Sequence, residues 1–219
     1  MIAINSTPIS RVEYTKFLGV LVDEKLTWRF HINHIATKIA CSLGMLSKVK
    51  RILPRNNLLT LYYSLIYPHL NYCISIWGNT FQIYLNKLLT LQKRAVRLIN
   101  CSFFRSHTNP IFIELRILKL PEIYKLSCLI FIYRYLANDL PSICRSLFLL
   151  RTYYSSATYY TRNNNQFVTP KYRTSVRGKC IAISGTAIWA TIPAELKLSY
   201  SLLGFKSKLR TFFLSKYIM

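Results

Sequence analysis

The stretch FQIYLNKLLTLQKRAVRLI, residues 81–99, has the clearest structural pattern in the chain. At about 100° per residue of an α-helix, its basic side chains gather within roughly one third of the circumference. These side chains are Lys87, Lys93, Arg94 and Arg97. Apolar residues fill most of the remainder. The stretch therefore predicts an amphipathic helix with an apolar side for a core and a positive side for contact with something else.

Helical patterns continue on both sides of this stretch. Upstream, apolar residues spaced by three and four predict a helix over 31–51, and a second stripe runs from Leu58 up to Pro68. Downstream, the pattern predicts a loop over 101–112, one or two helical turns over 114–119, a helix from Pro121 through Tyr135, a short helix after Pro141 and a final helix over 202–216.

Strand patterns lie toward the two ends of the chain. Residues 1–22 combine apolar runs with turn signals, and Gly19 indicates a bulge or a close backbone approach, so a small β-hairpin is expected. β-branched residues return over 181–192, which predicts a short C-terminal sheet. The predicted fold class is mainly α (α+β), with a short N-terminal β-hairpin, a helical bundle, a small C-terminal sheet and a final helix.

The charge of the chain is lopsided. Its 219 residues include 30 Lys and Arg against 7 Asp and Glu, a formal net charge of +23. Such a body repels itself unless a polyanion is near, so nucleic acid or an anionic membrane surface is the expected partner. The alternative is a basic surface that is merely soluble. With 52% apolar residues, the chain does not have the composition of a disordered segment.

One long uncharged run could be mistaken for a membrane span. Residues 56–86 contain no Lys, Arg, Asp or Glu, and this run is longer than a bilayer requires. Pro68, Asn71 and other polar or helix-breaking residues interrupt it repeatedly. We therefore expect no transmembrane segment but a buried pair of helices joined near Gly78 and Asn79.

Cysteine usage indicates a reducing compartment. The six cysteines are scattered, no Cys-x-x-Cys pair occurs, and no signal peptide opens the chain. We expect buried free thiols and an intracellular location, in the nucleus or cytoplasm, without secretion.

Residues suited to catalysis are sparse. Two-metal phosphoryl transfer needs clustered carboxylates, and the only adjacent acids, Asp23 and Glu24, are expected to form a solvated turn. His31 and His34 are spaced for a metal on one helix face, but no third ligand follows, so a helix-start pair facing solvent is expected. We predict no catalytic residue, no metal site and no cofactor in this chain.

The remaining signals are binding signals. The basic side of residues 81–99 suits phosphate contact, and its alternative is a solvated face. Downstream, cations alternate with aromatic residues, a pattern that suits stacking on unpaired bases, with a flexible loop as the alternative. The cations of this tail are Arg162, Lys171, Arg173, Arg177 and Lys179. Trp28, Trp77 and Trp189 are expected to anchor the core.

Several short motifs occur in an order that resembles a known family. They are Lys16-Phe17-Leu18-Gly19-Val20, Leu26-Thr27-Trp28, His31-Ile32, Pro68-His69-Leu70, Trp77-Gly78, Leu91-Gln92-Lys93-Arg94-Ala95 and Trp189-Ala190-Thr191-Ile192-Pro193. Together they resemble the segment downstream of the polymerase active site in LINE-type non-LTR retrotransposon reverse transcriptases, especially the jockey and CR1 groups.

The resemblance implies a division of the chain and a role for each part. Residues 1–27 resemble the end of the palm with its primer grip at Phe17, Leu18 and Gly19, residues 28–150 a helical thumb that holds template–primer duplex, and residues 151–219 a basic C-terminal region. The family's aromatic-x-Asp-Asp motif, which holds the catalytic Mg²⁺ ions of the intact polymerase, does not occur here.

These lines of reasoning predict a reverse transcriptase fragment that binds RNA, DNA or an RNA–DNA duplex without catalysis. The alternatives are a non-functional degenerate reading frame and a basic peripheral membrane protein. The sequence leaves the oligomeric state open.

Overall fold

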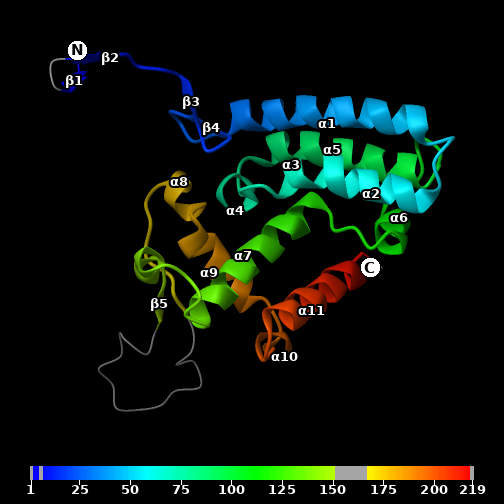
Figure 1. Ribbon diagram of the computed structural model, residues 1–219. Helices are drawn as coiled ribbons and strands as arrows, with labels where there is room; N and C mark the ends of the chain where they lie inside the picture. The colour runs from blue at the N-terminus through cyan, green and yellow to red at the C-terminus, as the bar shows by residue number, and fades with distance from the viewer. Residues whose placement is uncertain (1, 5–6, 151–166, 218–219) are drawn as a thin grey trace.

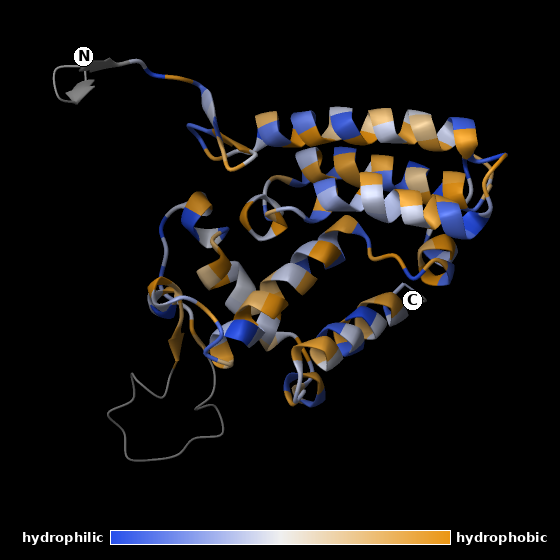
Figure 2. Cartoon of the chain, in the orientation of Figure 1, coloured by the Kyte–Doolittle hydropathy of each residue, from blue (hydrophilic) through white to orange (hydrophobic). Residues whose placement is uncertain are grey.

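The computed structural model describes residues 2–4, 7–150 and 167–217 (Figure 1). Its largest layer contains α1 (Arg29–Val49), α2 (Arg55–Leu65) and α5 (Gln82–Ile99), which pack against one another. Blue and orange alternate along α1 in Figure 2, as a helix with one buried face requires. The predicted stripe along α1 is confirmed, because all its members are buried: Ile32, Ile35, Ile39, Leu43 and Leu46.

The uncharged run is only partly buried, and its core residues alternate with exposed ones. It forms α2 and two short helices, α3 (Tyr67–Asn71) and α4 (Ile74–Trp77), before the chain turns at Gly78 into α5. The Trp77 side chain is fully buried, and its indole N–H donates to the Tyr72 carbonyl at 2.8 Å. Within the part of the chain that the structure describes, no helix has both the length and the apolarity to cross a bilayer.

A second group of helices surrounds α7 (Leu120–Leu136), which crosses below the first layer in Figure 1. Pro121 stands in its first turn, as predicted. The helices α9 (Ile181–Ala190) and α11 (Leu202–Ser215) pack on α7, and the rings of Tyr133 and Phe205 stack at 4.6 Å. The short α8 (Ser175–Gly178) and α10 (Ala194–Lys197) complete this part. One hydrophobic cluster includes residues from Ile32 to Tyr217.

The strands form small antiparallel pairs. β1 (Ile2–Ile4) pairs with β2 (Thr7–Ile9), and β3 (Tyr14–Phe17) pairs with β4 (Val20–Asp23), so the N-terminal hairpin prediction is confirmed. The C-terminal pair is β5 (Leu149–Leu150) with β6 (Phe167–Val168).

The strand prediction for 181–192 is wrong, because residues 181–190 form α9 and the next two residues a turn and a bend. Gly185 lets α9 approach α7, since a Cβ there would lie 3.3 Å from the Ile132 side chain. Burial of this face on α7 outweighs the β propensity of its isoleucines.

The smaller predictions have mixed outcomes. Residues 109–114 form α6 (Asn109–Glu114) rather than the end of a loop, with Pro110 in its first turn, and residues 115–119 are not helical. The short helix predicted after Pro141 is confirmed as the 3₁₀ segment η1 (Ser142–Leu147). All six cysteines are free, but only Cys128 is buried, where burial raises its pKa to about 11.

Candidate nucleic-acid interface

The predicted grip residues form the tip of the β3–β4 hairpin. Phe17 and Leu18 are 66% and 74% exposed, and we call Phe17–Gly19 the hairpin tip. Both Leu18 (φ 46°) and Gly19 (φ 81°) have positive φ, as a tight hairpin turn requires. The Tyr72 hydroxyl donates to the Leu18 carbonyl at 2.7 Å. The tip is therefore held from the α3–α4 junction while its apolar side chains face solvent.

Asp23 is buried, which corrects the prediction of a solvated turn. Its carboxylate accepts from the Thr27 N–H at 3.0 Å, from the Trp28 N–H at 3.2 Å and from the Thr27 hydroxyl. Glu24 is exposed and pairs with Arg11 at 2.6 Å. Asp23 thus fixes the loop between the hairpin and α1, where Trp28 has a positive φ of 62°.

His31 is also buried, whereas His34 is exposed, so the predicted solvent-facing pair is only half correct. The His31 Nδ1 accepts from the Leu21 N–H at 3.3 Å, and its ring lies edge-on to Trp77. Burial, followed by the nearby charges of His34 and Lys38, lowers the pKa of His31 to about 4. Neutral His31 therefore joins β4 to α1.

The helix α5 presents the predicted basic residues along one side. We call Lys87, Lys93, Arg94 and Arg97 the α5 basic face. Lys87 and Arg94 are exposed, and the other two are half-buried. The Lys87 ammonium donates to Asn33 Oδ1 at 2.7 Å, and the Arg97 Nε–H donates to the Ser106 carbonyl at 2.9 Å.

The predicted cations of the tail are partly described. Arg162 lies outside the described residues, as do the neighbouring Tyr159 and Tyr160. The other four surround α8: Lys171, Arg173 and Arg177 are exposed, and Lys179 is half-buried. The Lys179 Nζ lies 3.4 Å from the centroid of the Phe81 ring, next to the start of α5. The structure thus brings one tail cation to the helix that carries the α5 basic face.

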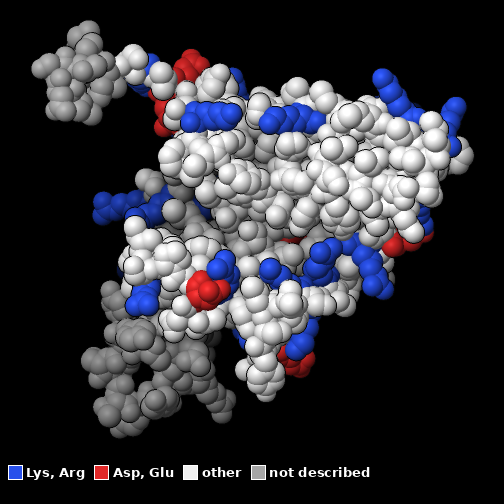
Figure 3. All heavy atoms as spheres, viewed as in Figure 1, with Lys and Arg blue, Asp and Glu red and all other residues white. Residues whose placement is uncertain are grey.

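The cations predicted to bind nucleic acid form no ion pairs with carboxylates in the described ranges. In the described ranges, the cations that pair with Asp or Glu are Arg11, Arg55, Lys125 and Arg134. None of the eight described cations predicted to bind nucleic acid is among them. Figure 3 shows separate Lys and Arg side chains over one face of the molecule, with Asp or Glu side chains beside several of them. The excess of 30 Lys and Arg over 7 Asp and Glu gives the chain its positive charge.

Gln92 is a buried polar residue that the sequence analysis missed. It lies inside the Leu91–Ala95 motif and is fully buried. Its Nε2 donates to the Tyr62 hydroxyl at 3.0 Å and to the Leu118 carbonyl at 2.8 Å, and its Oε1 accepts from the Leu120 N–H at 2.9 Å. A polar residue on the apolar side of the helical wheel was the available signal.

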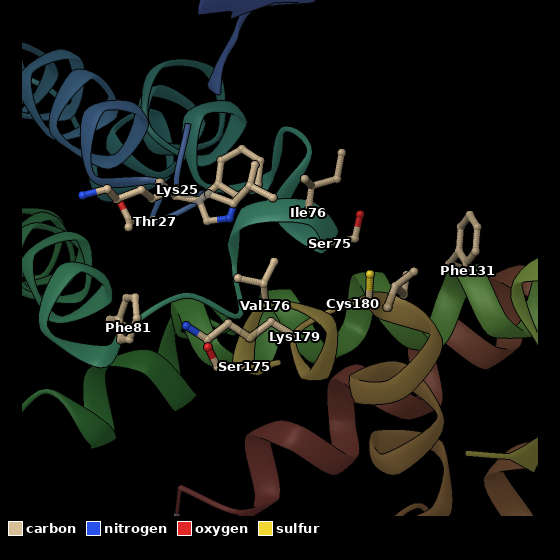
Figure 4. A pocket seen from close by; sticks show the side chains of 13 residues that line it. Lys25, Thr27, Ser75, Ile76, Phe81, Phe131, Ser175, Val176, Lys179 and Cys180 are labelled. Carbon is tan, nitrogen blue, oxygen red and sulfur yellow. The ribbon is translucent and has the colours of Figure 1, made fainter. Parts of the chain in front are cut away.

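A large pocket lies between the loop before α1, the helix α4 and the segment from α8 to the start of α9. We call it the aromatic pocket; its volume is about 630 Å³. Trp28, Phe81 and Phe131 line it together with Lys25 and Lys179, and its described lining includes no Asp or Glu. Figure 4 shows Ser75 and Ile76 of α4 on one side of the pocket, opposite the segment that carries Val176, Lys179 and Cys180. The pocket therefore combines apolar rings with positive charge.

Fold and site together define a mainly helical, strongly basic segment with exposed cations and no cluster of three metal-ligating residues in its described part. The chain is 31% identical over 110 residues to the probable RNA-directed DNA polymerase from transposon X-element of Drosophila melanogaster. It is 28% and 29% identical, over 125 and 126 residues, to the RNA-directed DNA polymerases from mobile element jockey of Drosophila funebris and Drosophila melanogaster.

These matches cover 48–55% of this chain and 12–14% of the relatives, so the chain spans only a small part of their length. No protein-family model matches the chain, and no solved structure matches it. The relatives confirm the predicted resemblance to the RNA-directed DNA polymerases of jockey-type LINE elements, and this chain matches a part of such a polymerase.

Proposed function

We propose that this chain is the nucleic-acid-holding segment of a retrotransposon RNA-directed DNA polymerase, and that it binds template–primer without catalysing nucleotide addition. The observation that carries the proposal is the set of eight described cations without carboxylate partners. Phosphate is the ligand that such cations meet in a polymerase, and contacts to the backbone position a duplex without reading its sequence.

The parts of the interface have distinct roles in this proposal. The α5 basic face contacts backbone phosphates, and the hairpin tip lies against the primer end. The aromatic pocket takes an unpaired base, because its rings offer stacking surfaces and its two lysines lie where the attached phosphates would follow. A volume of about 630 Å³ also lies within the usual range for small-ligand pockets.

The same proposal divides the chain into a primer-grip hairpin region (1–27), a thumb-like region (28–150) and a basic C-terminal region (151–219). It also places the action of the chain inside the cell. A segment that holds template–primer works where the nucleic acid is, in the nucleus or the cytoplasm. The catalytic Mg²⁺ ions would belong to the rest of the polymerase.

The salt dependence of binding tests the proposal. Fluorescence anisotropy with a labelled RNA–DNA duplex gives the slope of log K against log salt, which is about −0.9 for each phosphate neutralised. The variant Lys87→Ala/Arg94→Ala should reduce this slope in magnitude by about 2. The control Arg55→Ala/Arg134→Ala removes the same charge from cations that already pair with Glu114 and Asp139, and its slope should match the parent.

Binding that stays constant between low and high salt would contradict the proposal. Equal slope changes in the two variants would show that net charge matters and the α5 basic face does not. Sedimentation with anionic vesicles, in competition with the duplex, separates nucleic-acid binding from membrane binding.

A further inference from the structure

A second cavity lies beside the hairpin tip, on the side of α1 and α3. We call it the histidine pocket; its volume is about 290 Å³. It is lined by Gly19, His31, His34, Ile35, Lys38, Pro68, His69 and Tyr72. Three of the four histidines of the chain therefore meet in one place, although they come from two regions of the sequence.

The titratable groups of this pocket are all basic or neutral at pH 7. The described lining includes no carboxylate. Partial burial lowers the pKa of both His34 and His69, and the charge of Lys38 lowers both further, with Lys16 also acting on His34 and His34 on His69. Like charges that repel one another across a cavity are relieved when an anion lies between them.

His31 adds a hydrogen-bond donor that no other group satisfies. Because its Nδ1 accepts from the Leu21 N–H, the neutral ring carries its proton on Nε2. This Nε2 is buried and has no hydrogen-bond partner, and it is the single side-chain N or O atom of that kind among the described residues. Buried donors are rarely left unsatisfied, and this N–H is an unpaired polar group behind the wall of the pocket, without a surface open to the cavity.

We propose that the histidine pocket binds a backbone phosphate of the nucleic acid, with protonated His34 and His69 and the Lys38 ammonium as its positive groups. This inference rests on the proposed function, because the phosphate belongs to the strand that lies against the hairpin tip. The position follows from Tyr72, which lines the pocket and also holds the Leu18 carbonyl.

A phosphate fits this set better than a metal or a carboxylate does. In the described part of the chain, no three His, Cys, Asp or Glu side chains are placed so that they could hold a metal ion, and the cationic Lys38 disfavours a cation. A phosphate group offers several acceptor oxygens, so it can meet two imidazolium groups and an ammonium together. Binding then takes up protons, and affinity must rise as the pH falls.

The pH dependence of duplex binding tests the inference. Anisotropy with the labelled RNA–DNA duplex at constant ionic strength should give a dissociation constant about 10-fold lower at pH 5.5 than at pH 7.5 for the parent chain. For the variant His34→Gln/His69→Gln, the dissociation constant should change less than about 2-fold between the two pH values. The matched control His107→Gln, which alters the exposed histidine outside the pocket, should keep the full dependence.

Each outcome separates the inference from the proposed function. Salt-dependent binding that does not change with pH would overturn the histidine pocket and leave the proposed function standing. Loss of the pH dependence in His107→Gln would overturn it as well, as would a pH effect seen only with anionic vesicles. Absence of duplex binding at every pH would overturn both. Titration of the histidine side chains by NMR gives a direct readout, because duplex should raise the pKa of His34 and His69.

Discussion

Gln92 should contribute more to stability than any cation of the motif in which it stands. The variant Gln92→Leu keeps the size of the side chain but removes three hydrogen bonds in the core. The Tyr62 hydroxyl, the Leu118 carbonyl and the Leu120 N–H, all in buried residues, would lose their partner. Each unsatisfied group costs about 1–3 kcal/mol.

The sum is roughly 3–9 kcal/mol, and the apolar leucine side chain offsets about 2 kcal/mol of it. We therefore expect a net loss of about 1–7 kcal/mol, with a central value of about 4 kcal/mol, which is a large part of the stability of an ordinary domain. With a slope of about 2 kcal/mol per M, the midpoint of urea unfolding should fall by about 0.5–3.5 M. Far-UV circular dichroism, which reports helix content, would follow the transition.

Two variants keep this reasoning open to refutation. Gln82→Leu makes the same change on an exposed position of α5 and should alter stability by less than about 0.5 kcal/mol. Tyr62→Phe removes one partner only, so its effect and that of Gln92→Leu should sum to more than the double variant shows. A Gln92→Leu midpoint no lower than that of Gln82→Leu would refute the account.

Two further predictions concern buried contacts. Folded His31 has a pKa of about 4, below the unfolded value of about 6.5. Its contribution to the free energy of unfolding is therefore complete above pH 6.5 and is lost as the pH falls toward 4, by up to about 3 kcal/mol. The variant His31→Asn keeps an acceptor for the Leu21 N–H, so it should flatten this part of a plot of the urea midpoint against pH. Gly78→Ala should destabilise the chain by about 1–3 kcal/mol, because its Cβ would lie 2.5 Å from the Ile74 carbonyl and 2.6 Å from the Tyr124 ring. Gly44→Ala in α1, whose Cβ would have nothing within 4 Å, should be neutral or stabilising in the same urea unfolding measurement.

The sequence predicted the elements whose signals are local. Helical periodicity gave α1, α5 and α11, and Pro121 marked the start of α7. The helix α9 could not be predicted from local patterns, because the β-branched residues of 181–192 favour a strand. Packing on α7 stabilises the helix instead, and a local pattern does not show which surface a segment will pack on.

The candidate site was predictable in its residue types but not in its arrangement. The α5 basic face followed from the helical wheel alone. The contact between Lys179 and Phe81 and the meeting of His34 with His69 join residues far apart in the sequence, and no periodicity encodes such proximity. Asp23 and His31 were expected in solvent because polar residues usually lie there, although both are buried with partners that only the folded hairpin supplies.

The burial of Asp23 explains how one short connector can set the spacing of two binding sites. Residues 17–31 contribute Gly19 and His31 to the histidine pocket and residues 25–28 to the aromatic pocket. Between these contributions, the Asp23 carboxylate fixes Thr27 and Trp28 at the start of α1. One of the few acids in a chain of charge +23 thus accepts from two backbone N–H groups and the Thr27 hydroxyl. In our proposals, the distance between the bound phosphate and the stacked base is therefore a property of this loop, and a change at Asp23 should disturb both sites together.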